Sequence, residues 1–176
     1  AVMLPGVTNR MRATLEVLDF NHVRGQWGFS AGRRQLDWAN APDATIAGGV
    51  WRAVTGTNDL PVLRADARDL DRAGARDVTT FRMRLSGTNA VTQASITWRI
   101  VDEHGRTNEP GMSLAVPVNG QWYTHLFFGG RERAWRGRLQ AVELVPASNA
   151  DVTIELDHIT LHHAPAPART SYDDSH

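Results

Sequence analysis

Tryptophan and arginine are the residue types of this sequence that could do chemistry at a binding surface. Six tryptophans occur among 176 residues, and Trp27, Trp38 and Trp135 stand beside glycine, arginine, aspartate or asparagine residues that favour loops. An exposed indole offers a flat apolar plane on which a ring-shaped, hydroxyl-bearing ligand can stack. We therefore expect these three indoles to be ligand platforms, with core packing as the alternative for each of them.

Arginine supplies the polar half of the same expected surface. Arg82 and Arg84 alternate with apolar residues in one expected strand, and Arg99 does so in the next. If these strands are neighbours in one sheet, the three guanidinium groups form a row of donors. A guanidinium group binds carboxylate or sulfate through two parallel hydrogen bonds, so such a row suits acidic ligands. The alternative is a solvated face on which acidic neighbours pair with the arginines.

Known catalytic motifs are absent from the sequence. It contains no phosphate-binding glycine loop, no His-Glu-x-x-His pair and no nucleophile elbow. Tyr123 and His125 would share one face of a strand, which suits a lyase-type site. A carboxylate pair for glycoside hydrolysis is assembled by the fold, and the acids available for it are Asp102, Glu103, Glu132, Glu143 and Glu155. A small lyase or glycosidase is therefore the first alternative to a binding protein.

The composition excludes several classes of function. Cysteine is absent, which rules out disulfide bonds and thiolate chemistry. The 19 basic residues, all of them arginine, balance 19 acidic residues, so no overall field draws in nucleic acid or an anionic membrane. No stretch approaches the roughly 20 consecutive apolar residues that a membrane-spanning helix needs. We expect neither a nucleic-acid partner nor membrane insertion.

Short apolar runs between turn residues make up most of the chain, which is typical of a β-sandwich or barrel. Phe81, Met83 and Leu85 alternate with polar residues at a period of two, and segment 96–100 repeats the pattern. These patterns predict an all-β fold, a two-sheet antiparallel β-sandwich of the jelly-roll type. The expected strands are 15–20, 49–55, 62–65, 78–85, 94–101, 113–118, 122–126, 139–145 and 152–161.

Turn residues and composition mark the links and the domain limits. Asn119-Gly120 predicts a hairpin, and His104-Gly105 predicts a second turn. The charged, alanine-rich stretch 66–77 predicts a short helix or a turn over one end of the sandwich. The chain from residue 164 onward is proline-rich and then polar, so we expect a sandwich domain over 1–163 and a flexible tail over 164–176.

A succession of motifs runs through most of the chain, from residue 19 to residue 161. The motifs are LDFN, WGF, GGVWRAVTGTNDLPVL, DVTTFRMRL, ASITWRI, VPVNGQWYTHLF, WRGRLQAVELVP and VTIELDHITL. Any one of them would fit many sandwich strands, and the order is the informative part. In this order the sequence resembles the jelly-roll carbohydrate-binding modules carried by bacterial polysaccharide-degrading enzymes.

The resemblance implies a non-catalytic domain whose concave sheet receives a glycan. It further implies a covalently linked catalytic domain, a secreted or cell-surface location and, in many such modules, one structural calcium ion. In the resembling modules the two terminal strands run side by side, which would bring Asp19 and Asp157 together as carboxylate ligands for calcium. A structural or assembly domain, with the arginine face as a protein contact, is the second alternative.

Overall fold

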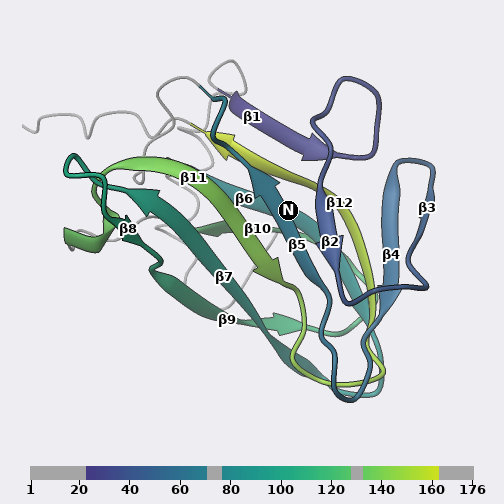
Figure 1. Ribbon diagram of the computed structural model, residues 1–176. Helices are drawn as coiled ribbons and strands as arrows, with labels where there is room; N and C mark the ends of the chain where they lie inside the picture. Colours follow the sequence, from purple (N-terminus) through teal and green to yellow (C-terminus); the bar gives the residue numbers. More distant parts are fainter. Residues whose placement is uncertain (1–22, 71–76, 128–132, 163–176) are drawn as a thin grey trace, which may run out of the picture.

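The computed structural model describes residues 23–70, 77–127 and 133–162 (Figure 1). Its strands are β1 (Val23–Gly28), β2 (Asp37–Ala39), β3 (Thr45–Ala47), β4 (Val50–Val54), β5 (Val62–Asp66), β6 (Val78–Ser86), β7 (Val91–Val101), β8 (Thr107–Asn108), β9 (Gly111–Pro117), β10 (Trp122–Phe127), β11 (Arg138–Val145) and β12 (Thr153–His162). One short 3₁₀ turn, η2 (Arg133–Trp135), is the helical part of the described residues, and they contain no helix long and apolar enough to cross a bilayer. The all-β prediction is confirmed.

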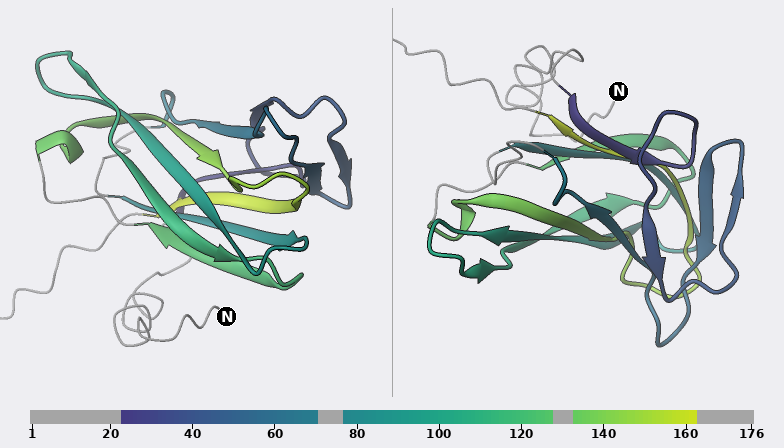
Figure 2. Two further views of the ribbon diagram at one scale, coloured as in Figure 1. Left: turned by 90° about the horizontal axis from the view of Figure 1, so that it is seen from below. Right: turned by 45° about the horizontal axis from the view of Figure 1, so that its top comes forward.

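The strands form two antiparallel sheets that pack face to face (Figure 2). Sheet A has the order β10-β6-β12-β4-β3, and β1 also pairs with β12. Sheet B has the order β2-β5-β11-β7-β8, and β9 also pairs with β7. This arrangement confirms the predicted two-sheet sandwich of the jelly-roll type.

Most successive strands lie in opposite sheets, and this crossing corrects two predictions. The chain passes from β6 in sheet A to β7 in sheet B, so Arg99 cannot share a row with Arg82 and Arg84. It passes back from β9 in sheet B to β10 in sheet A, so Asn119-Gly120 is a turn between the layers and the predicted hairpin is wrong. Gly120 takes a φ of 73°, which suits glycine in either kind of turn.

The core lies between the layers, where the alternating apolar side chains of both sheets meet. Phe81 and Met83 of β6 are buried, as predicted, and the intervening Arg82 is only half-buried on the outer face. From sheet B, Trp98 is buried as predicted and donates a hydrogen bond from its Nε1 to the Thr79 hydroxyl in sheet A at 3.1 Å. This bond satisfies the polar atom of a core indole, which burial requires.

The predicted strands from residue 49 onward all overlap observed strands. The structure adds β1, β2, β3 and β8, three of which are only two or three residues long. The described part of stretch 66–77 forms a turn after β5. The predicted strand 15–20 and the tail 164–176 lie outside the described residues, so the domain limits stay predictions.

β12 is the strand on which sheet A is organised. It pairs with β6 along one side, while its other side pairs with β4 over Thr153–Leu156 and with β1 over its second half. Val23 and His162 are register partners. The first and last described strands therefore run antiparallel and side by side.

Candidate functional site

Two of the three expected tryptophan platforms are buried, which corrects the prediction that they are exposed. Trp27 is 1% exposed, and its Nε1 donates a hydrogen bond to the Asp66 carbonyl oxygen at 3.2 Å. Trp135 is 6% exposed and packs edge-on against Trp98, with 4.6 Å between ring centroids. Strand β1 and turn η2 direct these two indoles inward, although their sequence neighbours are polar. Both indoles therefore stabilise the core.

Trp38 is the expected platform that the structure does expose. Its side chain is 37% exposed in β2, the edge strand of sheet B. Edge-on contacts hold the indole in place, with centroid distances of 5.6 Å to Phe29 and 6.3 Å to the buried Trp51. Ile46, exposed on β3, is the register partner of Trp51. Phe29, Trp38 and Ile46 thus form an apolar rim, the aromatic edge, where the edge strands of the two sheets meet.

A row of mostly polar residues crosses the outer face of sheet B and ends at Asp37 of β2. The next residue, Trp38, is the register partner of the buried Leu63, so its ring points toward the inner side of the sheet at the aromatic edge. The members of the row are successive register partners on five strands: Asp37, Arg64, Glu143, Thr97 and Gly111. Arg64 donates a hydrogen bond to Glu143 at 2.7 Å, and both side chains are partly exposed. Sequence reasoning missed this polar row, because its members come from strands whose pairing no local pattern reveals.

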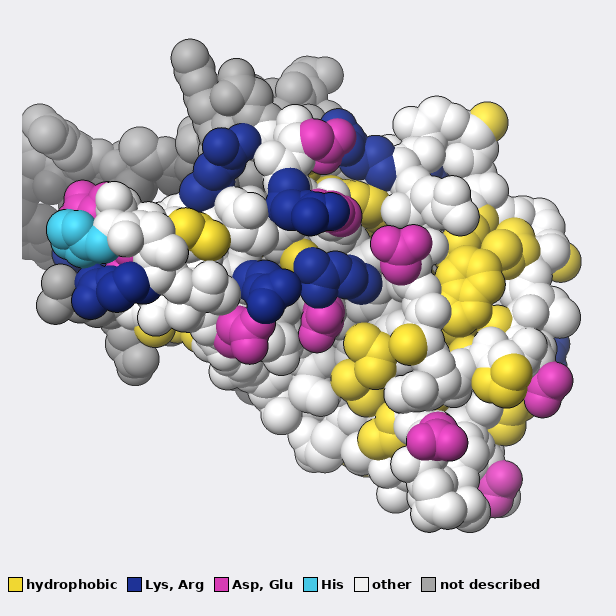
Figure 3. Space-filling view, in the orientation of Figure 1, with side chains coloured by type: hydrophobic (Ala, Val, Ile, Leu, Met, Phe, Trp, Pro, Cys, Tyr) yellow, Lys and Arg dark blue, Asp and Glu magenta, His cyan; other side chains and the backbone are white. Residues whose placement is uncertain are grey.

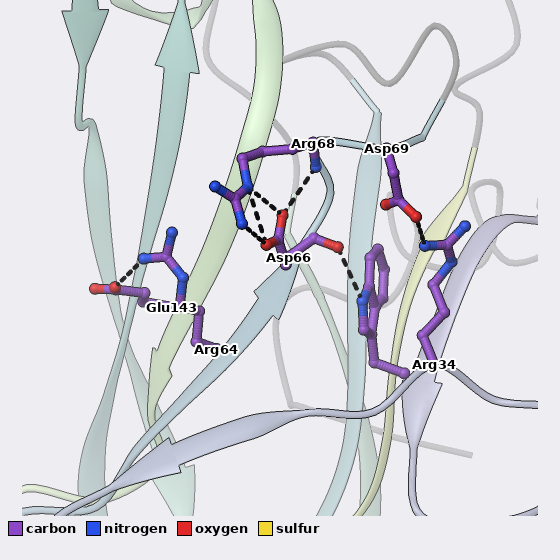
Figure 4. A network of polar contacts seen from close by, with 7 residues as sticks. Arg34, Arg64, Asp66, Arg68, Asp69 and Glu143 are labelled. Carbon is purple, nitrogen blue, oxygen red and sulfur yellow. Dashed lines mark hydrogen bonds and ion pairs between the residues drawn. The ribbon is translucent and has the colours of Figure 1, made fainter.

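On the same side of the molecule, further ion pairs balance the positive charges of the arginines with neighbouring carboxylates. Arg34 pairs with Asp69 at 2.6 Å and Arg68 pairs with Asp66 at 2.5 Å, as Figure 4 shows. The hydrogen bonds from these arginines lower the pKa of both aspartates, so all four groups are charged at neutral pH. Arg99 pairs with Glu109 at 3.1 Å.

Figure 3 shows the result on the surface: arginine and carboxylate side chains lie side by side across this face, and apolar side chains gather to one side of them. A surface of this kind offers many hydrogen-bond donors and acceptors with little net charge. A ligand rich in hydroxyl groups can accept from guanidinium groups and donate to carboxylates. The adjoining indole plane suits an apolar ring face.

Arg82 and Arg84 lie on the outer face of sheet A, where they contact Trp122. Arg84 donates two hydrogen bonds to Glu155, at 2.6 and 2.9 Å. The guanidinium carbons of Arg82 and Arg84 lie 5.2 and 5.1 Å from the centroid of the Trp122 ring. Trp122 is the register partner of Arg84 and is half-buried on the outer face, although its place in a run of alternating residues would also fit the core.

Asp157 fits poorly as a calcium ligand. Its carboxylate accepts a hydrogen bond from Arg33 at 2.8 Å and lies 3.6 Å from the Arg82 Nε, so the oxygens already face cations. Burial alone raises the pKa of Asp157, but the Arg33 hydrogen bond and the neighbouring His158 and Arg33 lower it overall. Asp19 lies outside the described residues, which include no group of three acidic or histidine side chains placed to hold a metal. The calcium site stays a prediction.

The Tyr123 and His125 pair expected for a lyase-type reaction does not form an open site. His125 is 1% exposed, and burial lowers its pKa to about 4. Its ring lies 6.1 Å from Tyr123 and 5.1 Å from the core residue Phe81, measured between centroids. Among the candidate acids, Asp102, Glu143 and Glu155 are in ion pairs with arginine, and Glu132 lies outside the described residues.

Comparisons with known proteins agree with the architecture. No protein-family model and no curated protein matches this sequence. Among solved structures, the CBM22-1 xylan-binding domain from Paenibacillus barcinonensis Xyn10C superposes with a TM-score of 0.51 at 16% identity, over 81% of this chain and 96% of that domain. PfGH50B superposes with a TM-score of 0.50 at 13% identity, over 79% of this chain and 24% of that longer chain. The chain therefore shares the β-sandwich fold of a carbohydrate-binding module.

Proposed function

We propose that this chain is a non-catalytic carbohydrate-binding module that binds a glycan on the outer face of sheet B. The observation that carries the proposal is the exposed Trp38 in edge strand β2, at the margin of sheet B beside Asp37, the first residue of the polar row. A sugar ring stacks its apolar face on the indole, and the row supplies hydrogen bonds to the hydroxyl groups of the following rings. Arg99, in the next register position, extends the set of donors.

The dimensions of the polar row suit a chain of sugars. Five strands at the usual spacing give the row a length of about 19 Å. Gly111 has no side chain at the far end, so the surface stays open there. At the near end, contacts with Phe29 and Trp51 fix the Trp38 ring before a ligand arrives, which lowers the entropy cost of binding.

The comparisons support this function through the fold. The xylan-binding domain has the same architecture, although its identity to this chain is too low to transfer a ligand. The chain aligns with about a quarter of the longer PfGH50B chain, which fits a domain that works as part of a larger protein. We accordingly propose a linked catalytic domain and a secreted or cell-surface location.

Calorimetry with a panel of soluble polysaccharides and oligosaccharides tests the proposal. We expect saturable binding of at least one neutral glycan, and a loss of about ten-fold or more in affinity in Trp38→Ala, the effect of removing a central aromatic anchor. Val54→Ala is the matched control, because Val54 is an exposed apolar side chain on sheet A. Equal affinity in Trp38→Ala and the unmodified protein, or no binding across the panel, would refute the proposal.

The same incubations separate the alternatives. We expect no new reducing ends and no unsaturated uronates, since the Tyr123 and His125 pair is not accessible as a site. Release of either product would favour a glycosidase or a lyase. A stable oligomer without glycan affinity in size-exclusion chromatography would favour an assembly domain.

A further inference from the structure

The outer face of sheet A differs from that of sheet B in its charge balance. Four arginines and two carboxylates gather there around one indole, and we call them the arginine–tryptophan cluster: Arg33, Arg52, Arg82, Arg84, Glu155, Asp157 and Trp122. The cluster therefore has an excess of two positive charges. His158 adds none at neutral pH, because burial lowers its pKa.

Strand register brings the cluster together. Arg52 of β4, Glu155 of β12, Arg84 of β6 and Trp122 of β10 are successive register partners across sheet A. Arg82 lies two residues before Arg84 on the same face of β6. The positions are therefore fixed by four paired strands rather than by a loop.

Several donors of the cluster have no acceptor within the described residues. Arg84 uses Nε and Nη2 for Glu155, which leaves Nη1. Arg82 makes one long ion pair through Nε, 3.6 Å from Asp157, which leaves both of its Nη groups. Arg52 is exposed and has no ion-pair partner in the described ranges.

The two central guanidinium groups are also held in place. Both lie over the Trp122 ring at about the same distance, 5.2 and 5.1 Å, so the indole adds to the restraint that the ion pairs place on these two long side chains. Two like charges side by side repel each other, and an anion bound beside them relieves that repulsion. Ordered donors and excess positive charge are the two requirements of an oxyanion site.

We infer that the arginine–tryptophan cluster is a second binding site, which takes the carboxylate or sulfate group of an acidic glycan. This site lies on the opposite sheet from the one in the proposed function and is independent of it. On sheet B, Arg64 and Arg99 each pair with a carboxylate, and such a surface suits hydroxyl groups. Sheet A keeps free donors for a planar or tetrahedral anion.

Nucleic acid fits the cluster less well than an acidic glycan does. The ring that would have to stack on a base, Trp122, already has two guanidinium groups over it. The formal net charge of the whole chain is zero, so long-range attraction for a polyanion is weak.

Matched pairs of ligands test the inference by calorimetry on the full chain. The probes are an oligogalacturonate and its methyl ester for the carboxylate, and dextran sulfate and dextran for the sulfate ester. We expect at least one charged member to bind, its neutral counterpart to bind about ten-fold or more weakly, and added salt to weaken the charged complex.

Arg52→Gln is the first variant, because this exposed, unpaired side chain can be replaced without disturbing the fold. It should weaken binding of the charged probe by about ten-fold, the usual effect of removing one charged hydrogen bond. Arg82→Gln should do the same. Arg106→Gln is the control, since Arg106 is exposed in the β7–β8 turn and pairs with Asp102. Circular dichroism verifies that each variant is folded.

Three results would overturn the inference. They are no binding of either charged probe, equal loss of affinity in Arg52→Gln and Arg106→Gln, and tighter binding of a thymidine oligonucleotide than of either polysaccharide. Trp38→Ala distinguishes this site from the proposed glycan site. It should leave the affinity for the charged probe unchanged, whereas Arg52→Gln should leave binding of a neutral glycan unchanged.

Discussion

Replacing His125 by phenylalanine should flatten the dependence of stability on pH. The His125 ring is buried between Phe81 and Tyr123, and neither ring nitrogen has a hydrogen-bond partner among the described residues. Burial therefore lowers its pKa from 6.5 to about 4. Between these values the unfolded chain binds more protons than the folded one. His125 thus makes stability rise with pH through this window, and stability is lost as pH falls from 6.5 toward 4.

The size of the effect follows from the two pKa values. Linkage gives a loss of about 2 kcal/mol from His125 alone between pH 7 and pH 5, and about 3 kcal/mol in full below pH 4. The half-buried His158 and the buried His162 also have lowered pKa values, but they are present in both proteins and cancel in the comparison. His125→Phe keeps an aromatic ring against Phe81 and removes two buried polar atoms, so it should be at least as stable at pH 5 as the unmodified protein.

Urea unfolding followed by tryptophan fluorescence, at half-unit steps from pH 5 to pH 7, measures this difference. We expect the free energy of unfolding of the unmodified protein to fall by about 2 kcal/mol more than that of His125→Phe over this range. His104→Gln, a change at an exposed turn residue, should follow the unmodified protein. Curves for His125→Phe and the unmodified protein that stay parallel would show that the ring is hydrated or hydrogen-bonded in the folded state.

Two other substitutions probe the strands that build the two surfaces. Gly137→Ala should destabilise the protein by about 2 kcal/mol or more, measured by urea unfolding. The reason is that Gly137 has a φ of 130° and that an added Cβ would meet the Val101 carbonyl oxygen. A loss of stability near zero would contradict this geometry. Glu155→Gln should lower stability by about 1 kcal/mol at pH 7, because it weakens the paired hydrogen bonds from Arg84. The Arg84 hydrogen bond lowers the pKa of Glu155 from its ordinary value of 4.5. The stability that the ionised Glu155 contributes is therefore present above pH 4.5 and is lost as pH falls through the lowered pKa. A stability difference between Glu155→Gln and the unmodified protein that persists in acid would contradict the ion-pair interpretation.

Local alternation in the sequence is sufficient to predict most strands and the direction of their side chains. Phe81 and Met83 point inward and Arg82 and Arg84 outward because the backbone of a strand alternates, whatever its partner. Short strands such as β2 cannot be predicted in this way, since three residues are too few to show the alternation of apolar and polar side chains.

The order of the strands in the two sheets cannot be predicted from local sequence patterns. Arg82 and Arg99 stand on successive long strands, yet the chain crosses between layers after β6 and puts them on opposite faces of the molecule. The polar row is invisible in the sequence for the same reason. Arg64 and Glu143 are 79 residues apart, and only the pairing of β5 with β11 makes them neighbours.

The tryptophans show how packing overrides composition near turns. Trp27 and Trp38 are both followed by small residues and lie in polar surroundings in the sequence, but one is 1% and the other 37% exposed. The difference comes from where each indole lies: Trp27 is in the core, where its Nε1 reaches the Asp66 carbonyl oxygen, whereas Trp38 is at the margin of sheet B in edge strand β2.

The pairing of β1 with β12 also indicates how the chain connectivity of the domain can be changed. Cα atoms of antiparallel partners are about 4.5–5.5 Å apart, so a linker of a few glycines would join Val23 to His162. New ends could then be opened at the Asn119-Gly120 turn, giving a circular permutant with the same sheets. For the same reason the domain could be inserted into a surface loop of a host protein, since its two attachment points lie side by side.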